Sequence, residues 1–342
     1  MLGEEHIKNR EKKPRGNLCK KVIFFFLFNI LFGGITLPII VFYGPFDNIR
    51  NAVVGSSYRT LNHQYIASFF LSEDEISKIL KNSEAKDPTK ENESIRLLKF
   101  GKDISDRVEV FNIKSRDFNG NIMIIHNPLS IRVGYSSQMP DSGQPTSVIA
   151  KNSKALAAIN AGGFKDNGYV GTGGVPIGFI IHDGKVVYNE YDNEKIRLDT
   201  AAFTDEGMLI VGRHSIEKLK EYNVKEAVSF GPPLIVNGKP TITQGDGGWG
   251  IAPRTAIGQR ESGEVLFLTI DGRSMGSIGA TLKDVQDILL QYGAVNAVNL
   301  DGGSSTTAFF NGKVINQPSN RLGERAVPSV FMAVPTGGVD PE

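Results

Sequence analysis

Two aspartates stand where catalytic carboxylates are often found, directly after strand-like apolar runs and directly before glycine. Asp301 follows the run 294–300, and Asp271 follows the run 265–270. A carboxylate in such a position can serve as a general base or a nucleophile, provided that the fold holds it beside the substrate. A polar turn explains the same pattern without any function, and this alternative stays open.

The residues after Asp301 read GGSSTT and have the composition of an anion-binding loop. Two glycines let the backbone turn sharply and present N–H groups, and the hydroxyls add further donors. Arginine also suits phosphate or carboxylate, because its guanidinium offers a fixed fork of donors. Arg254 and Arg273 each lie beside a predicted strand, although a single surface arginine is more often solvated than functional.

Most familiar catalytic motifs are missing. The stretch GRSMG at 272–276 matches a nucleophile elbow, but no helix follows directly and no histidine follows His214. A single cysteine excludes a disulfide framework and a thiolate zinc site. A net charge of +1 gives no reason to expect nucleic acid as a partner. Any chemistry would therefore rely on carboxylates, hydroxyls and arginine.

The elements that must position these residues are mostly short strands. The chain has 38 glycines, and Asn-Gly or Asp-Gly pairs between apolar runs predict hairpins at 183–184, 237–238 and 311–312. One helix is predicted from a cap at Thr281 to Gly293, followed by a strand that ends at Asp301. We expect one α+β domain over 105–336, mainly of mixed or antiparallel sheets with a few flanking helices.

The N-terminal part has the pattern of a membrane anchor. Residues 22–43 contain no charge and are long enough to span a bilayer. Residues 1–21 are rich in Lys and Arg, so the positive-inside rule predicts a cytoplasmic tail and an extracellular remainder on a single-pass membrane protein. Residues 44–104 are expected to form a stalk with a helical segment that begins at Ser72. A cleaved signal peptide and a buried core helix are the alternatives; the length of the run and the absence of a clear cleavage site favour an uncleaved signal-anchor.

Taken in order, several motifs over 105–336 resemble the phosphodiester glycosidase family, which contains the catalytic domain of N-acetylglucosamine-1-phosphodiester α-N-acetylglucosaminidase. The chain is similar to a bacterial, membrane-anchored member. The motifs are NAGGF (160–164), SFGPPLIVNGKP (229–240), PRTAIG (253–258), TIDGR (269–273), GATLKDVQDILLQYGAVNAVNLDGGSSTT (279–307), NQPS (316–319) and ERAVP (324–328). Ala161 and Lys165 depart from the usual form of the first motif, which leaves the substrate in doubt.

The resemblance implies a hydrolase that cuts the bond between a sugar and a phosphodiester oxygen. Asp301, Asp271 and Arg254 are the expected catalytic residues, with Arg254 on the phosphate and the aspartates as general base, nucleophile or stabiliser of the oxocarbenium ion. Asn160 and Asn316 are expected to bind the sugar. The complete expected substrate-binding set is Asn160, Gly162, Gly163, Thr255, Arg273, Gly302, Gly303, Ser304, Ser305, Asn316 and Arg325.

No cofactor is required by this chemistry, and no metal site is indicated. Two rival functions stay open. One is a metal-dependent phosphodiesterase that cuts the P–O bond, with a divalent cation on Asp271 and Asp301. The other is a non-catalytic module that binds an anionic wall glycopolymer. The expected partners are the lipid bilayer, through residues 22–43, and a phosphodiester-linked glycan of the cell wall or an exopolysaccharide.

Overall fold

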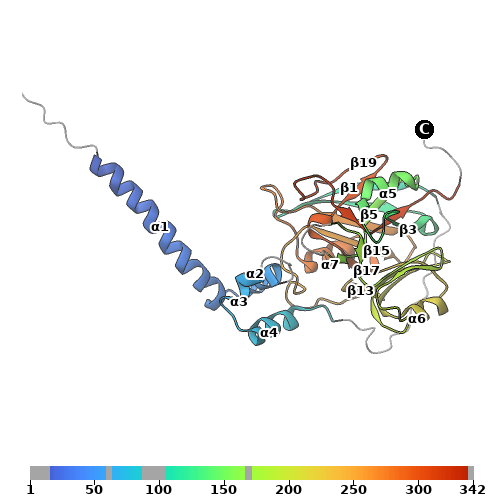
Figure 1. Cartoon of the computed structure of the whole chain (residues 1–342), viewed down its shortest axis with the longest axis horizontal. Coiled ribbons are helices and arrows are strands. Elements are labelled where there is room, and N and C mark those ends of the chain that lie inside the picture. Colours follow the sequence, from blue (N-terminus) through green and yellow to red (C-terminus); the bar gives the residue numbers. More distant parts are fainter. Residues whose placement is uncertain (1–15, 59–63, 87–104, 166–171, 338–342) are drawn as a thin grey trace, which may run out of the picture. The chain divides into compact units, whose positions relative to one another are not determined.

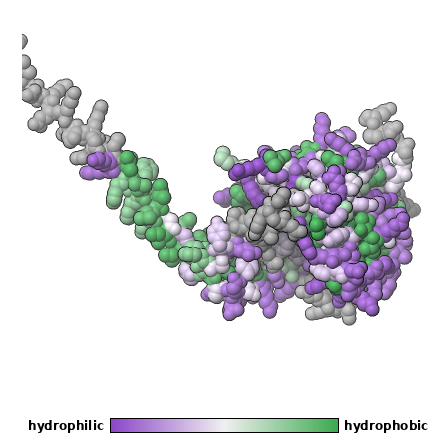
Figure 2. All heavy atoms as spheres, in the orientation of Figure 1, coloured by the Kyte–Doolittle hydropathy of each residue, from purple (hydrophilic) through white to green (hydrophobic). Residues whose placement is uncertain are grey.

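The computed structural model describes residues 16–58, 64–86, 105–165 and 172–337. Two compact units are divided after Arg50. The first contains a single long helix, α1 (Gly16–Tyr43). Its apolar side chains are largely exposed, as Figure 2 shows in green, and over Lys20–Tyr43 it is long and apolar enough to cross a membrane. Such a helix fits a single-pass anchor, and a signal sequence near an N-terminus has the same character.

The second unit contains three main antiparallel sheets (Figure 1). The first has the order β1 (Val108–Lys114), β2 (Asn119–Ile125), β16 (Val265–Ile270), β15 (Arg254–Arg260), β17 (Ala294–Leu300), β13 (Pro233–Val236) and β14 (Lys239–Pro240). The second has the order β11 (Leu209–His214), β10 (Leu198–Thr204), β12 (Val224–Ser229), β8 (Phe179–His182) and β9 (Lys185–Asn189). The third has the order β19 (Lys313–Val314), β18 (Ala308–Phe310), β5 (Ala157–Asn160), β21 (Ser329–Ala333) and β3 (Ile131–Tyr135).

Short elements complete this unit. Two small ladders pair β20 (Ala326–Val327) with β4 (Gln144–Pro145) and β6 (Phe164–Lys165) with β7 (Val175–Pro176). The helices are α2 (Asp47–Tyr58), which belongs to this unit from Asn51 onward, α3 (Tyr65–Ser68), α4 (Glu73–Ser83), α5 (Thr146–Asn152), α6 (Ile216–Glu221) and α7 (Leu282–Gln291), with single 3₁₀ turns η2 (Pro128–Ser130) and η4 (Gly303–Ser305).

The main core lies where the three sheets meet. Phe267 of β16, Phe203 of β10 and Phe331 of β21 come from different sheets and belong to one buried cluster. The rings of Phe203 and Phe331 meet edge to face with centroids 5.9 Å apart. A second cluster holds α7 against the first sheet through Leu282 and Leu289. Packing on both faces makes the first sheet, which carries Asp271 and Asp301 at its strand ends, a rigid platform.

Elements with strong local signals form as the sequence predicts. The pairs at 183–184, 237–238 and 311–312 each connect two paired strands, and all six residues have positive φ, as a tight two-residue hairpin requires. Capping boxes start α4 at Ser72 and α7 at Thr281. The prediction of an α+β fold built mainly of antiparallel sheet is confirmed.

The segment expected to form a stalk over 44–104 is in large part packed in the second unit. From Asn51 onward its described residues belong to the same compact unit as the sheets. Ser56 of α2 accepts a hydrogen bond from the Ile251 N–H at 2.9 Å, and Glu84 forms an isolated parallel bridge with Gly247. The sequence could not reveal this, because these contacts join residues more than 160 positions apart.

Candidate active site

Asp271 and Asp301 end up at the same edge of the seven-stranded sheet. Strands β16 and β17 are both antiparallel to β15 and lie on either side of it, so both run toward the edge where β15 begins. The register pairs Ile270 with Arg254 and Leu300 with Thr255. Because neighbouring strands lie about 4.8 Å apart, the two strand backbones are separated by about 10 Å. Each aspartate is the first residue after its strand.

The backbone of Asp301 is fixed on both sides. Its N–H donates to the carbonyl of Ala161 at 2.9 Å, and its carbonyl accepts from Asn160 Nδ2 at 2.6 Å. Burial raises the pKa of the Asp301 carboxyl to about 6, against the opposing effects of donated hydrogen bonds from Ser305 and Gly302 and of the charge on Arg325. A carboxyl with such a pKa can change protonation state near neutral pH, which suits a catalytic acid or base.

Asn160 is a positioning residue and not the sugar ligand that the resemblance implied. It is fully buried, and its Oδ1 accepts from the Thr255 hydroxyl at 2.8 Å and from the Thr307 N–H at 3.1 Å. Its Nδ2 holds the Asp301 carbonyl. Thr255 is equally buried and serves the same network. Both residues therefore act on the site through Asp301.

Asp271 is held by residues that follow the 302–307 turn. Asn316 Nδ2 and the Gln317 N–H both donate to Oδ1 of Asp271 at 3.0 Å. Asn316 also donates to the Thr306 carbonyl at 3.1 Å and accepts from the Ala308 N–H at 2.8 Å, so its amide orients Asp271. Its expected contact with sugar stays a prediction. Burial raises the pKa of Asp271, partly offset by the hydrogen bonds from Gln317 and Asn316.

Two arginines converge on the turn after Asp301. Arg325 Nη1 donates to the Ser304 hydroxyl at 2.8 Å, and its guanidinium lies 4.8 Å from the centre of the Phe164 ring. Arg273 has positive φ, and its Nη2 lies 3.3 Å from where a Cβ on Gly303 would be. Burial, and next the charge of Arg325, lowers the pKa of Arg273. Two like charges held close to each other over a glycine turn favour an anionic ligand.

Arg254 has a different role from the one expected. It is 4% exposed, and its guanidinium donates to three backbone carbonyls: Ala280 at 3.0 Å, Trp249 at 2.9 Å and Gly250 at 2.6 Å. Burial lowers its pKa to about 10, which leaves it charged at neutral pH. We therefore reassign it from phosphate binding to holding the loop that carries Trp249.

The four glycines of the expected site are places of close approach. A side chain on Gly302 would meet the Pro253 carbonyl at 2.7 Å, and one on Gly163 would meet the Phe230 ring at the same distance. The N–H of Gly162 donates to the Ser329 hydroxyl at 3.1 Å. Gly303 adopts φ +61 and donates to the Pro253 carbonyl. Their lack of side chains lets segments 160–164, 229–233 and 301–305 meet.

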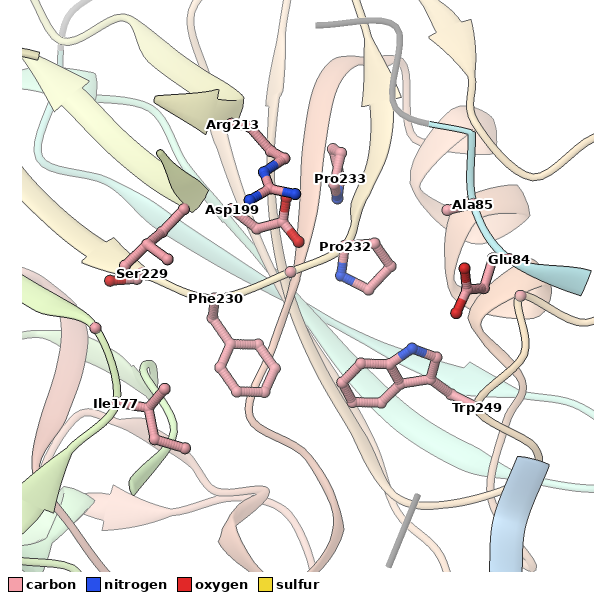
Figure 3. Close-up of a pocket in the computed structure, with 14 residues that line it drawn as sticks. Glu84, Ala85, Ile177, Asp199, Arg213, Ser229, Phe230, Pro232, Pro233 and Trp249 are labelled. Atoms are coloured by element: carbon pink, nitrogen blue, oxygen red, sulfur yellow. The ribbon is translucent and has the colours of Figure 1, made fainter. Parts of the chain in front are cut away.

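The segment 229–233 also borders a pocket. A pocket of about 340 Å³ is lined by Phe230, Trp249, Asp199, Arg213 and Glu84 among others (Figure 3). Trp249 and Glu84 were not predicted from the sequence as site residues. The available signal for Trp249 was its place, as the one tryptophan of the chain, within the glycine-rich run GDGGWG. Within the described residues, no group of three or more His, Cys, Asp or Glu side chains is arranged to hold a metal ion.

Two carboxylates lie beside an arginine-lined, glycine-rich turn, an arrangement that suits hydrolysis of an anionic substrate. A family model for phosphodiester glycosidases matches residues 153–334, and the chain belongs to this family of enzymes. The prophage-derived uncharacterized protein YomE of Bacillus subtilis is 32% identical over 200 residues, which are 56% of this chain and 30% of that protein. Human N-acetylglucosamine-1-phosphodiester α-N-acetylglucosaminidase is 39% identical over 70 residues, 20% of this chain and 13% of that protein. The chain thus spans less than a third of the length of these relatives.

Solved structures agree with this assignment. The zebrafish N-acetylglucosamine-1-phosphodiester α-N-acetylglucosaminidase catalytic domain, auto-inhibited by its pro-peptide, aligns with a TM-score of 0.60 and 25% identity over 72% of this chain and 90% of that one. A hypothetical protein from Synechocystis has a TM-score of 0.51 at 19% identity, over 66% of this chain and 61% of that one, and shares the fold. Membership of the phosphodiester glycosidase family, expected from the motifs, is confirmed.

Proposed function

We propose that this chain hydrolyses the glycosidic C–O bond of a sugar-1-phosphodiester and releases the free sugar and a phosphate monoester. The observation that carries the proposal is the convergence of Arg273 and Arg325 on the turn that follows the ionisable Asp301. Family membership supports a hydrolase for sugar phosphodiesters. The sugar is proposed to be an N-acetylhexosamine or a related hexose, because the named relatives act on N-acetylglucosamine-1-phosphodiesters.

The available side chains suit this bond cleavage. Ordinary glycosidases need a general acid, because an alkoxide is a poor leaving group. A phosphate monoester has a second pKa of about 6 and departs with little protonation. The remaining tasks are to hold the phosphate, to stabilise positive charge on the sugar ring and to activate water or supply a nucleophile.

In the proposed roles, Arg273, Arg325 and the Ser304 hydroxyl hold the phosphate. Asp301 and Asp271 face the sugar, and in their ionised forms one activates water or attacks the anomeric carbon while both favour the oxocarbenium-like transition state. Hydrolysis then adds a water hydroxyl to the anomeric carbon, and the bonding electron pair leaves with the phosphate oxygen. No step in this scheme requires a metal or an organic cofactor.

The test uses the full-length chain in detergent micelles with an N-acetylglucosamine-1-phosphate alkyl diester in oxygen-18 water. We expect the heavy oxygen in the released sugar. Heavy oxygen in the phosphate would instead indicate cleavage of the P–O bond and contradict the proposal. Asp301→Asn should abolish turnover, while Asp287→Asn, which removes an exposed carboxylate from α7, should leave it intact. A fully active Asp301→Asn enzyme would contradict the assignment of Asp301.

We further propose that α1 anchors the protein in the cell membrane with its basic N-terminus in the cytoplasm. The enzyme would then act outside the cell, on phosphodiester-linked glycans of the cell wall or exopolysaccharide. The support is the uncharged run 22–43 preceded by a lysine- and arginine-rich tail. Protease treatment of intact cells tests the topology: we expect the sheets to be degraded from outside, and their protection would contradict this orientation.

A further inference from the structure

The pocket beside the site has two aromatic rings as its principal apolar surfaces. Phe230 and Trp249 are both partly exposed, with ring centroids 6.2 Å apart and planes inclined at 64°, so they form a corner (Figure 3). The volume of about 340 Å³ is in the range of small-molecule sites. The apolar faces of a pyranose ring pack well on aromatic surfaces, while its hydroxyls need polar partners at the edge.

The polar lining fits an uncharged ligand. The charged side chains of the lining are two carboxylates, Glu84 and Asp199, and one guanidinium, Arg213. Asp199 and Arg213 are cross-strand partners on β10 and β11, and Figure 3 shows their side chains beside each other. Two of the three charged side chains of the lining are carboxylates, which disfavours a phosphate in this pocket. Carboxylate oxygens and guanidinium N–H groups both suit sugar hydroxyls.

Part of the pocket comes from a segment outside the family match. Glu84 and Ala85 follow α4, whereas the matched region starts at residue 153. Their placement is fixed, because Glu84 bridges to Gly247 and the Lys86 N–H donates to the Thr241 carbonyl at 2.9 Å. Glu84 and Ala85 therefore form part of the pocket lining, and the segment that follows α4 does more than connect α1 to the sheets.

The same segment helps to hold Trp249. Its neighbour Gly250 has φ +58, and a side chain there would clash with Ser56 Oγ of α2. Ser56 accepts from the Ile251 N–H at 2.9 Å, and from the other side Arg254 donates to the carbonyls of Trp249 and Gly250. Hydrogen bonds to Ser56 of α2 and to the buried Arg254 thus hold the loop, and they fix the position of the Trp249 backbone.

The pocket and the proposed cleavage site share a wall. The N–H of Asn299 donates to the Pro232 carbonyl at 3.1 Å, and its side chain donates to the Gly231 carbonyl at 2.8 Å. Asn299 precedes Asp301 by two residues, which corresponds to about 7 Å along a strand. On the other side, the Phe230 ring lies against Gly163 of the segment that holds Asp301. A ligand in the pocket would lie next to a substrate on Asp301.

We propose that this pocket is a subsite for a second, uncharged sugar residue, a hexose or N-acetylhexosamine, linked to the unit whose phosphodiester bond is cut. The substrate is then an oligosaccharide or polymer, and Glu84 helps to select it. This inference rests on the proposed function for its account of turnover, but binding of a sugar to the pocket can be measured without it.

Trp249 provides a direct probe, because it is the only tryptophan in the chain. The full-length protein in detergent micelles is titrated with maltose, lactose and N,N′-diacetylchitobiose, none of which contains a phosphodiester. We expect a saturable change in tryptophan emission with at least one of them. Phe230→Ala and Glu84→Ala should each weaken that binding, by about tenfold for Phe230, where the ring loses its contact with the sugar. Phe111→Ala, which removes an exposed phenyl ring on β1, is the matched control and should change nothing.

Turnover separates this inference from the proposed function. The ratio of kcat/KM for a disaccharide-1-phosphate diester to that for the monosaccharide diester should fall in Phe230→Ala and in Glu84→Ala. Two outcomes would refute the subsite and leave the proposed function standing. In the first, both diesters are hydrolysed but sugars do not change the emission of Trp249. In the second, both are hydrolysed and neither variant alters the ratio of kcat/KM values. A sugar response lost in both variants, with no hydrolysis of either diester, would support the subsite and refute the proposed function.

Discussion

Replacing Asp301 with asparagine should make the protein more stable and inactive. Burial raises the pKa of this carboxyl from 3.8 to about 6, so the folded state disfavours its charge. At 1.36 kcal/mol per pKa unit, ionised Asp301 destabilises the fold by about 3 kcal/mol above pH 7. Asparagine has nearly the same shape, carries no charge and can still accept a hydrogen bond from Ser305, so most of this energy should be recovered.

The stability gained by Asp301→Asn should depend on pH, which identifies the carboxyl group as its cause. The folded protein binds the proton more tightly than the unfolded chain, so the wild type keeps the stability linked to this group below pH 3.8 and loses it as the pH rises through 6. The advantage of Asp301→Asn should therefore be about 3 kcal/mol at pH 8, about half as large at pH 5 and small at pH 4.

The measurement is urea unfolding of the full-length chain in detergent micelles, followed by the emission of Trp249, at pH 8 and pH 5. Asp287→Asn is the matched control, because this carboxylate is exposed on α7 and forms a surface ion pair with Lys283. It should change stability by about 0.5 kcal/mol or less. The reasoning would be refuted if Asp301→Asn is no more stable than the wild type at pH 8. It would also be refuted if the variant is stabilised equally at both pH values.

Three further predictions concern the same site. The wild-type kcat/KM should rise with pH through about 6 as Asp301 ionises, and a profile that is flat from pH 5 to 8 would contradict an ionised catalytic role. Arg325→Gln and Arg273→Gln should each lower kcat/KM by about 10- to 100-fold and weaken inhibition by inorganic phosphate, measured by steady-state kinetics; unchanged phosphate inhibition in both would rule out the phosphate assignment. Asn160→Ala should destabilise the protein by about 2–4 kcal/mol in urea unfolding, because it removes three buried hydrogen bonds, and a loss below about 0.5 kcal/mol would show that the network is dispensable.

Several residues of the expected site position other residues or a loop of the site. Asn160 holds Asp301, Asn316 holds Asp271, and Arg254 holds the loop of Trp249. In each case the polar side chain forms hydrogen bonds with other groups of the protein: backbone carbonyls for Arg254, and both backbone and side-chain groups for Asn160 and Asn316. Residue type and spacing predict that such side chains matter, but they do not separate a group that contacts substrate from one that positions it.

The sequence by itself determined the features that depend on neighbouring residues. Hairpin turns at 183–184, 237–238 and 311–312 follow from the tolerance of Asn, Asp and Gly for positive φ. Helix α7 begins at a capping box formed by Thr281 and Asp284, which are three positions apart. The uncharged run 22–43 forms one apolar helix. The ordered motifs also predicted the family and the two aspartates at strand ends. These signals are local, so no knowledge of distant contacts was needed.

Only the tertiary structure decided which side chains remain available to a ligand. Thr255 and Asn160 are 95 residues apart, and their hydrogen bond exists because β5 and β15 bring them together in the core. The meeting of Glu84 with Trp249 at one pocket likewise depends on how α2 and α4 pack on the loop before β15. Buried hydrogen-bonding groups must be satisfied by whatever the fold places beside them. Long-range packing therefore engages the side chains of Arg254 and Asn160 in buried hydrogen bonds. It places the guanidinium groups of Arg273 and Arg325 at the glycine turn.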